Sequence, residues 1–257
     1  MSGTLPISVL LLARGEGERL ERLIPTLRFA REVVVVWDPA GDAATRATAE
    51  RLGASVFVRA LDGFGPQRQY ALARCREPWV LWLDADEQLD AAATRAIAER
   101  VAADGPAAGY TLARHGHFLG RRIRFCGWQG ERVLRLFRRE RARFDDAPVH
   151  ERVIVDGALG RLDGAIEHHS YATWSDCTDK LQRYAAAGAE RARRAGRRAG
   201  PADVALRPPL RFLRMYLLQL GVLDGAHGLL LCGLAAAQVF LKYGALWAMG
   251  SGGGARR

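Results

Sequence analysis

The sequence predicts an α/β protein whose N-terminal part holds a parallel sheet, and two observations lead to this prediction. Short apolar runs without the alternation of half-exposed strands recur between segments of helical spacing, as is typical of strands buried on both faces of a parallel sheet. Charged residues follow three of these runs, at the points where the strands would end. The 257 residues suffice for one large α/β domain with an appendage.

The predicted elements alternate along the first 103 residues. We expect strands at 7–13, 33–38, 55–60 and 78–87, and helices at 15–30, 44–54, 65–75 and 91–103. Beyond Gly109 the pattern changes to strands or loops of a mixed sheet, at 109–123, 132–144 and 149–162. Ligands bind beyond the carboxyl ends of parallel strands, so the charged residues that follow the first, second and fourth strands would converge on one edge.

The C-terminal part is predicted to be helical and far more apolar than the rest. A helix at about 174–199 precedes the apolar region 211–249, in which the longest uncharged piece is Gly228 to Leu241. That piece is shorter than the roughly 18 to 20 residues needed to span a bilayer. We therefore expect a domain at 1–205 and a helical segment at 206–257 that lies at a membrane interface or packs as a core helix pair.

Charge and cysteine content narrow the classes of partner and compartment. The formal net charge is +10, and the segment from Lys180 to Arg214 holds ten basic and two acidic residues, a local +8. This segment favours an anionic membrane surface as a partner, with a solvated helix face as the alternative. The four cysteines are widely scattered, without a C-x-x-C pair, so neither a disulfide framework nor a zinc site is indicated and a reducing compartment fits.

The stretch WVLWLDADEQL at 79–89 places three carboxylates directly after a buried strand. In an extended chain Asp84 and Asp86 share a face, and each would raise the pKa of the other unless a cation neutralises them. Mg²⁺ or Mn²⁺, held by one or two carboxylates and completed by substrate phosphates, is the natural cation. The alternative is helix capping, which we prefer for Asp90, directly before the helix at 91–103.

Seven pieces in order along almost the whole chain carry a family resemblance: ISVLLLARGE, VVVVWD, GFGPQRQYAL, WVLWLDADEQL, RVLRLFRR, VHERV and FLRMYLLQLGVLDGAHG. With them the chain resembles inverting glycosyltransferases of family 2, which have a GT-A fold. It is especially similar to small bacterial transferases of lipopolysaccharide inner core biosynthesis that add glucose to heptose. The chain departs from the family at 14–17, where RGEG stands for a Lys-Asn-Glu-Glu type sequence, and at 38–42, where DPAGD lacks the usual hydroxyl residues.

The resemblance implies a role for each candidate residue. Asp86 would bind the metal, and Asp84 would lie near the metal or the ribose. The base would be Glu151, beside His150 as a metal ligand or diphosphate contact, with Asp145 and Asp146 as rivals. The remaining candidates for the nucleotide-sugar site are Arg14, Glu16, Asp38, Arg68 and Arg135.

The residue types support some of these roles and leave a structural alternative for others. The guanidinium fork of Arg68 and Arg135 suits phosphate oxygens. Asp38 precedes Pro39 and equally suits a turn. His168 and His169 are candidates for outer contacts of the site; they lack the spacing of a zinc site.

We therefore expect a cytoplasmic, metal-dependent, inverting glycosyltransferase on the inner face of the bacterial inner membrane. It would move a hexose, glucose from UDP-glucose, to a lipid-linked saccharide such as the heptose of the lipopolysaccharide inner core. Nucleic acid is not an expected partner. The alternatives are a sugar nucleotidyltransferase, transfer to another cell-envelope glycan, and a non-enzymatic binder of anionic surfaces, although the last leaves the acids after the buried strand unexplained.

Overall fold

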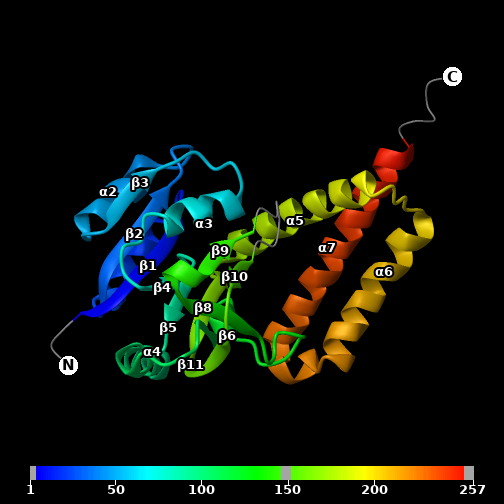
Figure 1. Ribbon diagram of the computed structural model, residues 1–257. Coiled ribbons are helices and arrows are strands. Elements are labelled where there is room, and N and C mark those ends of the chain that lie inside the picture. Colours follow the sequence, from blue (N-terminus) through cyan, green and yellow to red (C-terminus); the bar gives the residue numbers. More distant parts are fainter. Residues whose placement is uncertain (1–3, 146–151, 252–257) are drawn as a thin grey trace. The chain divides into compact units, whose positions relative to one another are not determined.

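The computed structural model describes residues 4–145 and 152–251 (Figure 1). The chain divides into two compact units. The first comprises Met1–Arg114 and Glu131–His168, and the second comprises His115–Gly130 and His169–Arg257.

The first unit begins with the predicted alternation of strands and helices. The strands β1 (Leu5–Ala13), β2 (Ala30–Trp37), β3 (Ser55–Val58) and β4 (Trp79–Trp82) are parallel neighbours in the order β3-β2-β1-β4. Between them lie α1 (Gly17–Leu23), α2 (Ala43–Arg51) and α3 (Phe64–Leu72). The helix predicted at 15–30 is shorter than expected: α1 ends at Leu23 and a 3₁₀ turn, Ile24–Leu27, follows, because Pro25 has no N–H to donate.

The sheet then becomes mixed, as the sequence predicts. The strands β5 (Glu87–Leu89), β6 (Gly109–Phe118), β8 (Arg132–Arg138) and β11 (Leu159–Tyr171) extend it in the order β4-β8-β6-β11-β5. The β4/β8, β8/β6 and β11/β5 pairs are antiparallel. Helix α4 (Ala91–Ala103) follows β5, and β9 (Ala142–Phe144) and β10 (Val153–Val155) form a separate two-stranded sheet. A 3₁₀ turn, Arg139–Arg141, joins β8 to β9.

Both faces of the parallel strands are buried, which explains why their sequences do not alternate. Val9 and Leu11 of β1 pack in a core cluster with residues of α1 and α4, such as Leu20 and Ile97. Leu10 belongs to a second cluster, which includes residues of α3. Successive side chains of a strand point to opposite faces, so a strand covered on both sides must be apolar throughout. Asp90 caps α4 by accepting a 2.6 Å hydrogen bond from the Ala93 N–H, as expected.

The second unit is mainly helical (Figure 1). Its elements are β7 (Arg121–Arg122), α5 (Trp174–Arg194), α6 (Pro201–Leu213), a π turn (Arg214–Leu218), a 3₁₀ turn (Gly221–Asp224) and α7 (Gly225–Ser251). Helix α7 packs against both α5 and α6. The carboxylate of Asp224 is buried at its start and accepts the backbone N–H groups of Arg124 and Phe125 at 3.0 and 2.9 Å. The acid that interrupts the apolar region therefore joins the loop at 115–130 to the helices.

Helices α6 and α7 expose a large apolar surface. Leu206, Leu210, Leu213 and Leu217 follow one another at helical spacing and are each about half exposed or more. Residues Gly221–Gly250 have a mean hydropathy of 1.7 in their most apolar window, of which only 17% is buried. In the described part of the chain this is the one helical stretch long and apolar enough to cross a bilayer by length and composition. Since apolar side chains in such numbers are costly in water, this surface is suited to contact with an apolar phase or a partner.

Candidate active site

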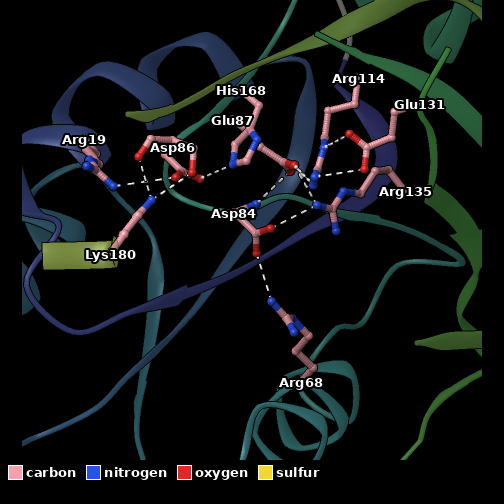
Figure 2. A network of polar contacts seen from close by, with 11 residues as sticks. Arg19, Arg68, Asp84, Asp86, Glu87, Arg114, Glu131, Arg135, His168 and Lys180 are labelled. Carbon is pink, nitrogen blue, oxygen red and sulfur yellow. Dashed lines mark hydrogen bonds and ion pairs between the residues drawn. The ribbon is translucent and has the colours of Figure 1, made fainter. Parts of the chain in front are cut away.

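The acids after β4 lie in a turn and not in an extended strand (Figure 2). The strand ends at Trp82, and residues 83–86 lead into β5, which pairs with β11 far from β4 in the strand order. Two hydrogen bonds close the turn: Glu87 N–H donates to the Asp84 carbonyl at 2.9 Å, and Asp84 N–H donates to Glu87 Oε2 at 3.1 Å. The expectation that the two aspartates share one face of an extended strand is therefore wrong, because the turn directs their carboxylates to different partners.

Arginines surround the carboxylate of Asp84. Arg68 Nη2, from α3, donates to Asp84 Oδ1 at 3.0 Å, and Arg135 Nη2, from β8, donates to Asp84 Oδ2 at 3.0 Å. Burial raises the pKa of Asp84, but the charges of Arg135 and Arg68 outweigh burial, so that its pKa lies below the ordinary value. The cation that the sequence requires beside this acid is thus supplied by two side chains of the protein itself.

The buried carboxylate of Glu87 binds the same arginine, Arg135. Glu87 has no exposed surface, and its Oε1 accepts a 2.7 Å hydrogen bond from Arg135 Nη2 and lies 3.6 Å from Arg114 Nη1. Arg114 pairs in turn with Glu131 at 3.0 Å. Burial lowers the pKa of Arg135, but Glu87 and Asp84 outweigh it and raise the pKa. The guanidinium is held charged and fixed in place.

The indole ring of Trp82 contacts both guanidiniums. The Arg135 and Arg68 guanidinium carbons lie 3.9 and 4.4 Å from the indole ring centroid. Burial lowers the pKa of Arg68, but the charge of Asp84 opposes this. An arginine can use its edge for a carboxylate and its face for an aromatic ring, which a lysine cannot do, so the residue type fits both contacts.

The carboxylate of Asp86 has different neighbours. Its Oδ1 lies 3.5 Å from His168 Nε2, and its Oδ2 lies 3.7 Å from Arg19 Nη1 of α1 (Figure 2). The register of β11 against β5 places His168 directly opposite Glu87 and so beside Asp86. A carboxylate oxygen and an imidazole nitrogen at this separation are a ligand pair that suits Mn²⁺.

A divalent metal fits Asp86 and His168 if substrate phosphates and water supply its other ligands. No group of three or more His, Cys, Asp or Glu side chains that could hold a metal exists among residues 4–145 and 152–251. Mg²⁺ and Mn²⁺ in nucleotide sites need only one or two protein ligands, because substrate phosphates and water complete the coordination. Asp86 with His168 would therefore fit a metal whose remaining ligands are water and the phosphate groups of a substrate.

The residues predicted to lie around the nucleotide come from the loops after β1 and β2. Asp38 is buried, its Oδ1 accepts the Ala40 N–H at 3.1 Å and its Oδ2 lies 3.6 Å from Arg14 Nε. Glu16 Oε2 accepts the N–H groups of Arg14 and Gly15 at 2.6 and 2.9 Å. The two loops are joined because Asp42 N–H donates to the Arg14 carbonyl at 3.1 Å. The structure thus brings Arg14 and Asp38 together, with Asp38 in the turn that its position before Pro39 suggests.

The predicted base and its neighbour, Glu151 and His150, lie outside the described residues, as does the rival Asp146. The other rival, Asp145, is described. Its Oδ1 accepts the Arg152 N–H at 2.9 Å, and its own N–H donates to the Arg152 carbonyl at 3.1 Å. These bonds pair residue 145 with residue 152, which supports a structural role for Asp145.

Comparison with known proteins decides the family. The model of the family described as "Glycosyl transferase family 2" matches residues 8–156, which include Arg68, Asp84, Asp86 and Arg135. The chain belongs to glycosyl transferase family 2. This family 2 transferase is 28% identical over 237 residues, 90% of its length and 85% of the relative, to the lipopolysaccharide core biosynthesis glycosyltransferase LpsC of Rhizobium meliloti.

A second relative and a solved structure are also glycosyltransferases. An uncharacterized glycosyltransferase of Rickettsia bellii is 35% identical over 86 residues, 34% of the family 2 transferase described here and 29% of that protein. Among solved structures, the mannosyltransferase PcManGT from Pyrobaculum calidifontis, in complex with GDP-Man and Mn²⁺, matches over 99% of this chain and 77% of its own, with a TM-score of 0.50 and 17% identity. The fold of this transferase is the GT-A fold that the sequence predicts.

Within the first unit, the contacts of Arg19, Arg114 and Glu131 and the burial of Glu87 against Arg135 were not predicted from the sequence. His168 was expected only as an outer contact. The register of β11 against β5 brings it to Asp86, and that pairing joins residues about 80 positions apart by a contact that no local pattern encodes.

Proposed function

We propose that this chain is a metal-dependent, inverting glucosyltransferase that moves glucose from UDP-glucose to the heptose of a lipopolysaccharide inner core. The observation that carries the proposal is the different environment of the two acids after β4. Asp84 is held by Arg68 and Arg135, whereas Asp86 faces His168. The similarity to LpsC along 90% of the chain supports a lipopolysaccharide core saccharide as the acceptor.

The residues would divide the work as follows. Asp86 and His168 would hold Mg²⁺ or Mn²⁺, which when bound supplies positive charge to the departing diphosphate. Arg68 and Arg135 would keep Asp84 ionised and in place, so that its carboxylate lies near the ribose or the metal. Arg14, Glu16 and Asp38 form the nucleotide side, and Glu151 is the proposed base, with His150 beside it. A base on the face opposite the leaving group gives inversion at the sugar carbon.

Attachment to the membrane is part of the proposal. The acceptor is a lipid, and segment 206–257 carries the exposed leucines of α6 and the apolar surface of α7. We propose that this segment associates peripherally with the anionic, cytoplasmic face of the inner membrane, where the enzyme meets its acceptor.

The test is a panel of nucleotide sugars with core-truncated lipopolysaccharide as acceptor. The readout is the nucleoside diphosphate released, with EDTA, Mg²⁺ or Mn²⁺. UDP-glucose should be the best donor, and EDTA should abolish transfer. Asp86→Asn should lower kcat by roughly 10²-fold or more, because removing charge stabilisation of this kind costs about 3 to 4 kcal/mol. Full activity of folded Asp86→Asn protein would refute the metal site, and pyrophosphate release from a nucleoside triphosphate would identify a nucleotidyltransferase instead.

A further inference from the structure

A basic pocket of about 340 Å³ lies within the second unit, where α5, α6 and α7 meet. Its lining holds four cationic side chains and no acidic one, together with apolar atoms: Ala192, Arg197, Arg198, Arg207, Lys242, Tyr243 and Leu246. The volume is within the range of pockets that bind small molecules. None of these residues belongs to the candidate active site.

Two of the four cations of the pocket, Arg207 and Lys242, are held in place by contacts with their neighbours. The Arg207 guanidinium lies 4.7 Å from the Tyr243 ring centroid, and its Nε donates to Asp203 at 2.6 Å. Lys242, one of only two lysines in the chain, packs its stem against α5 at Gly188, where a Cβ would come within 3.2 Å of Lys242 Cδ. The glycine therefore leaves the space that the lysine stem occupies.

Arg207 is the one cation of the pocket for which the described residues provide an acidic partner, Asp203. Arg197, Arg198 and Lys242 have no acidic partner within residues 4–145 and 152–251. Two other arginines of the same region, Arg193 and Arg194, are both paired with Glu190 at 2.8 Å. The pocket thus concentrates three unneutralised cations where a small anion can contact all of them, which favours a phosphate group.

The surroundings of the pocket favour an anion with an apolar tail. Phe240, Leu241, Trp247 and Met249 lie on the same stretch of α7 as Lys242 and Leu246, and each is between 39% and 51% exposed. A free phosphate ion gains nothing from these side chains, whereas a lipid would place its headgroup in the pocket and its chains against them. An exposed Trp next to cations is the pattern of a side chain at the boundary of headgroups and acyl chains.

We propose that this pocket binds the phosphate of an anionic membrane phospholipid. The inference rests on the membrane attachment proposed above and gives it a defined binding site, formed by Arg197, Arg198, Arg207 and Lys242. The lipid would dock at the junction of the three helices while the apolar surface of α6 and α7 enters the outer part of the bilayer.

The test compares two double variants of the full chain that remove the same charge. Arg197→Gln with Arg198→Gln removes two cations from the pocket, whereas Arg193→Gln with Arg194→Gln removes two arginines outside the pocket that share the carboxylate of Glu190. Binding is measured by co-sedimentation with vesicles of phosphatidylcholine alone or with a fifth of phosphatidic acid, at about 0.15 M salt, where the Debye length is about 8 Å. We expect the pocket pair to weaken binding to the anionic vesicles roughly tenfold or more and the control pair less than about threefold. Lys242→Gln should act in the same direction as the pocket pair.

The other outcomes overturn the inference. Equal losses for the two pairs would mean a diffuse basic surface without a pocket. Binding of inorganic phosphate as tight as that of the vesicles, measured by calorimetry, would mean a site for a free anion. Transfer to a soluble acceptor fragment, read by released nucleoside diphosphate, should be unchanged in both pairs, so a failed donor assignment and a failed lipid site are separate results.

Discussion

Arg135 and Glu87 form a buried ion pair, with Nη2 and Oε1 2.7 Å apart, and Glu87 also closes the turn that carries Asp84 and Asp86. Removing Glu87 takes from the buried Arg135 guanidinium its nearer carboxylate and leaves Asp84, at 3.0 Å, to compensate a charge that is costly to bury. The pair thus connects the stability of the sheet to the position of the site.

Glu87→Gln should therefore be strongly destabilising. We expect a loss of about 3 to 5 kcal/mol in the free energy of unfolding, measured by urea titration. Glu131→Gln removes a carboxylate that is 44% exposed and also pairs with an arginine, and it should cost less than about 1 kcal/mol. Equal effects of the two variants would contradict the structural role of Glu87.

The lowered pKa of Asp84 predicts a dependence of stability on pH. A carboxyl whose folded-state pKa is below its unfolded value of 3.8 contributes stability above that value, and the contribution is lost as pH falls through the folded-state pKa. The stability gap between wild type and Asp84→Asn should be constant from about pH 7 to 5 and narrow below about pH 4. Urea titrations across this range measure it; a gap that widens toward acid would have the wrong sign.

His168→Gln should change the metal requirement more than the fold. We expect the Mn²⁺ concentration for half-maximal transfer to rise on the order of tenfold, because one nitrogen ligand is lost. His169→Gln is the matched control, since its ring contacts His117, with ring centroids 4.4 Å apart. If both variants raise the Mn²⁺ requirement equally, His168 is not a metal ligand.

Gly41→Ala tests the nucleotide loops. A Cβ at this position would overlap the Arg14 carbonyl, so the loops after β1 and β2 must separate. We expect KM for the donor to rise roughly tenfold and stability to fall by about 1 to 3 kcal/mol. Gly53→Asn, in open space at φ 83°, should change neither, because asparagine tolerates the left-handed region. Lower stability with an unchanged KM would remove these loops from the donor site.

Much of the fold could be predicted from the sequence because its signals are local. The apolar runs place β1 to β4, and Asp90 with the helical pattern after it places α4 at residues 91–103. The prediction from sequence fails where contacts between residues far apart in the chain determine the structure. The turn at 83–86 lies where the chain passes from β4 to β5, which pairs with β11. The burial of the Glu87 carboxylate in β5 depends on Arg135 from β8.

The candidate site shows the same division. The acids after β4 were visible as a like-charged pair, and Arg68 and Arg135 were candidates for contacts with phosphate oxygens. That the arginines already neutralise Asp84 could not be predicted, because α3, β4 and β8 meet only in the folded sheet. The requirement for a cation, inferred from repulsion alone, is met in part by the protein.

The unequal surroundings of the two aspartates bear on how such a chain can evolve. Asp84 is tied to the scaffold through Arg68 and Arg135, so its replacement disturbs α3, β4 and β8 together. The contacts of Asp86 with His168 and Arg19 are longer, at 3.5 and 3.7 Å. A lineage can therefore change residue 86 without rebuilding the junction of α3, β4 and β8, whereas residue 84 is fixed as long as that architecture is kept.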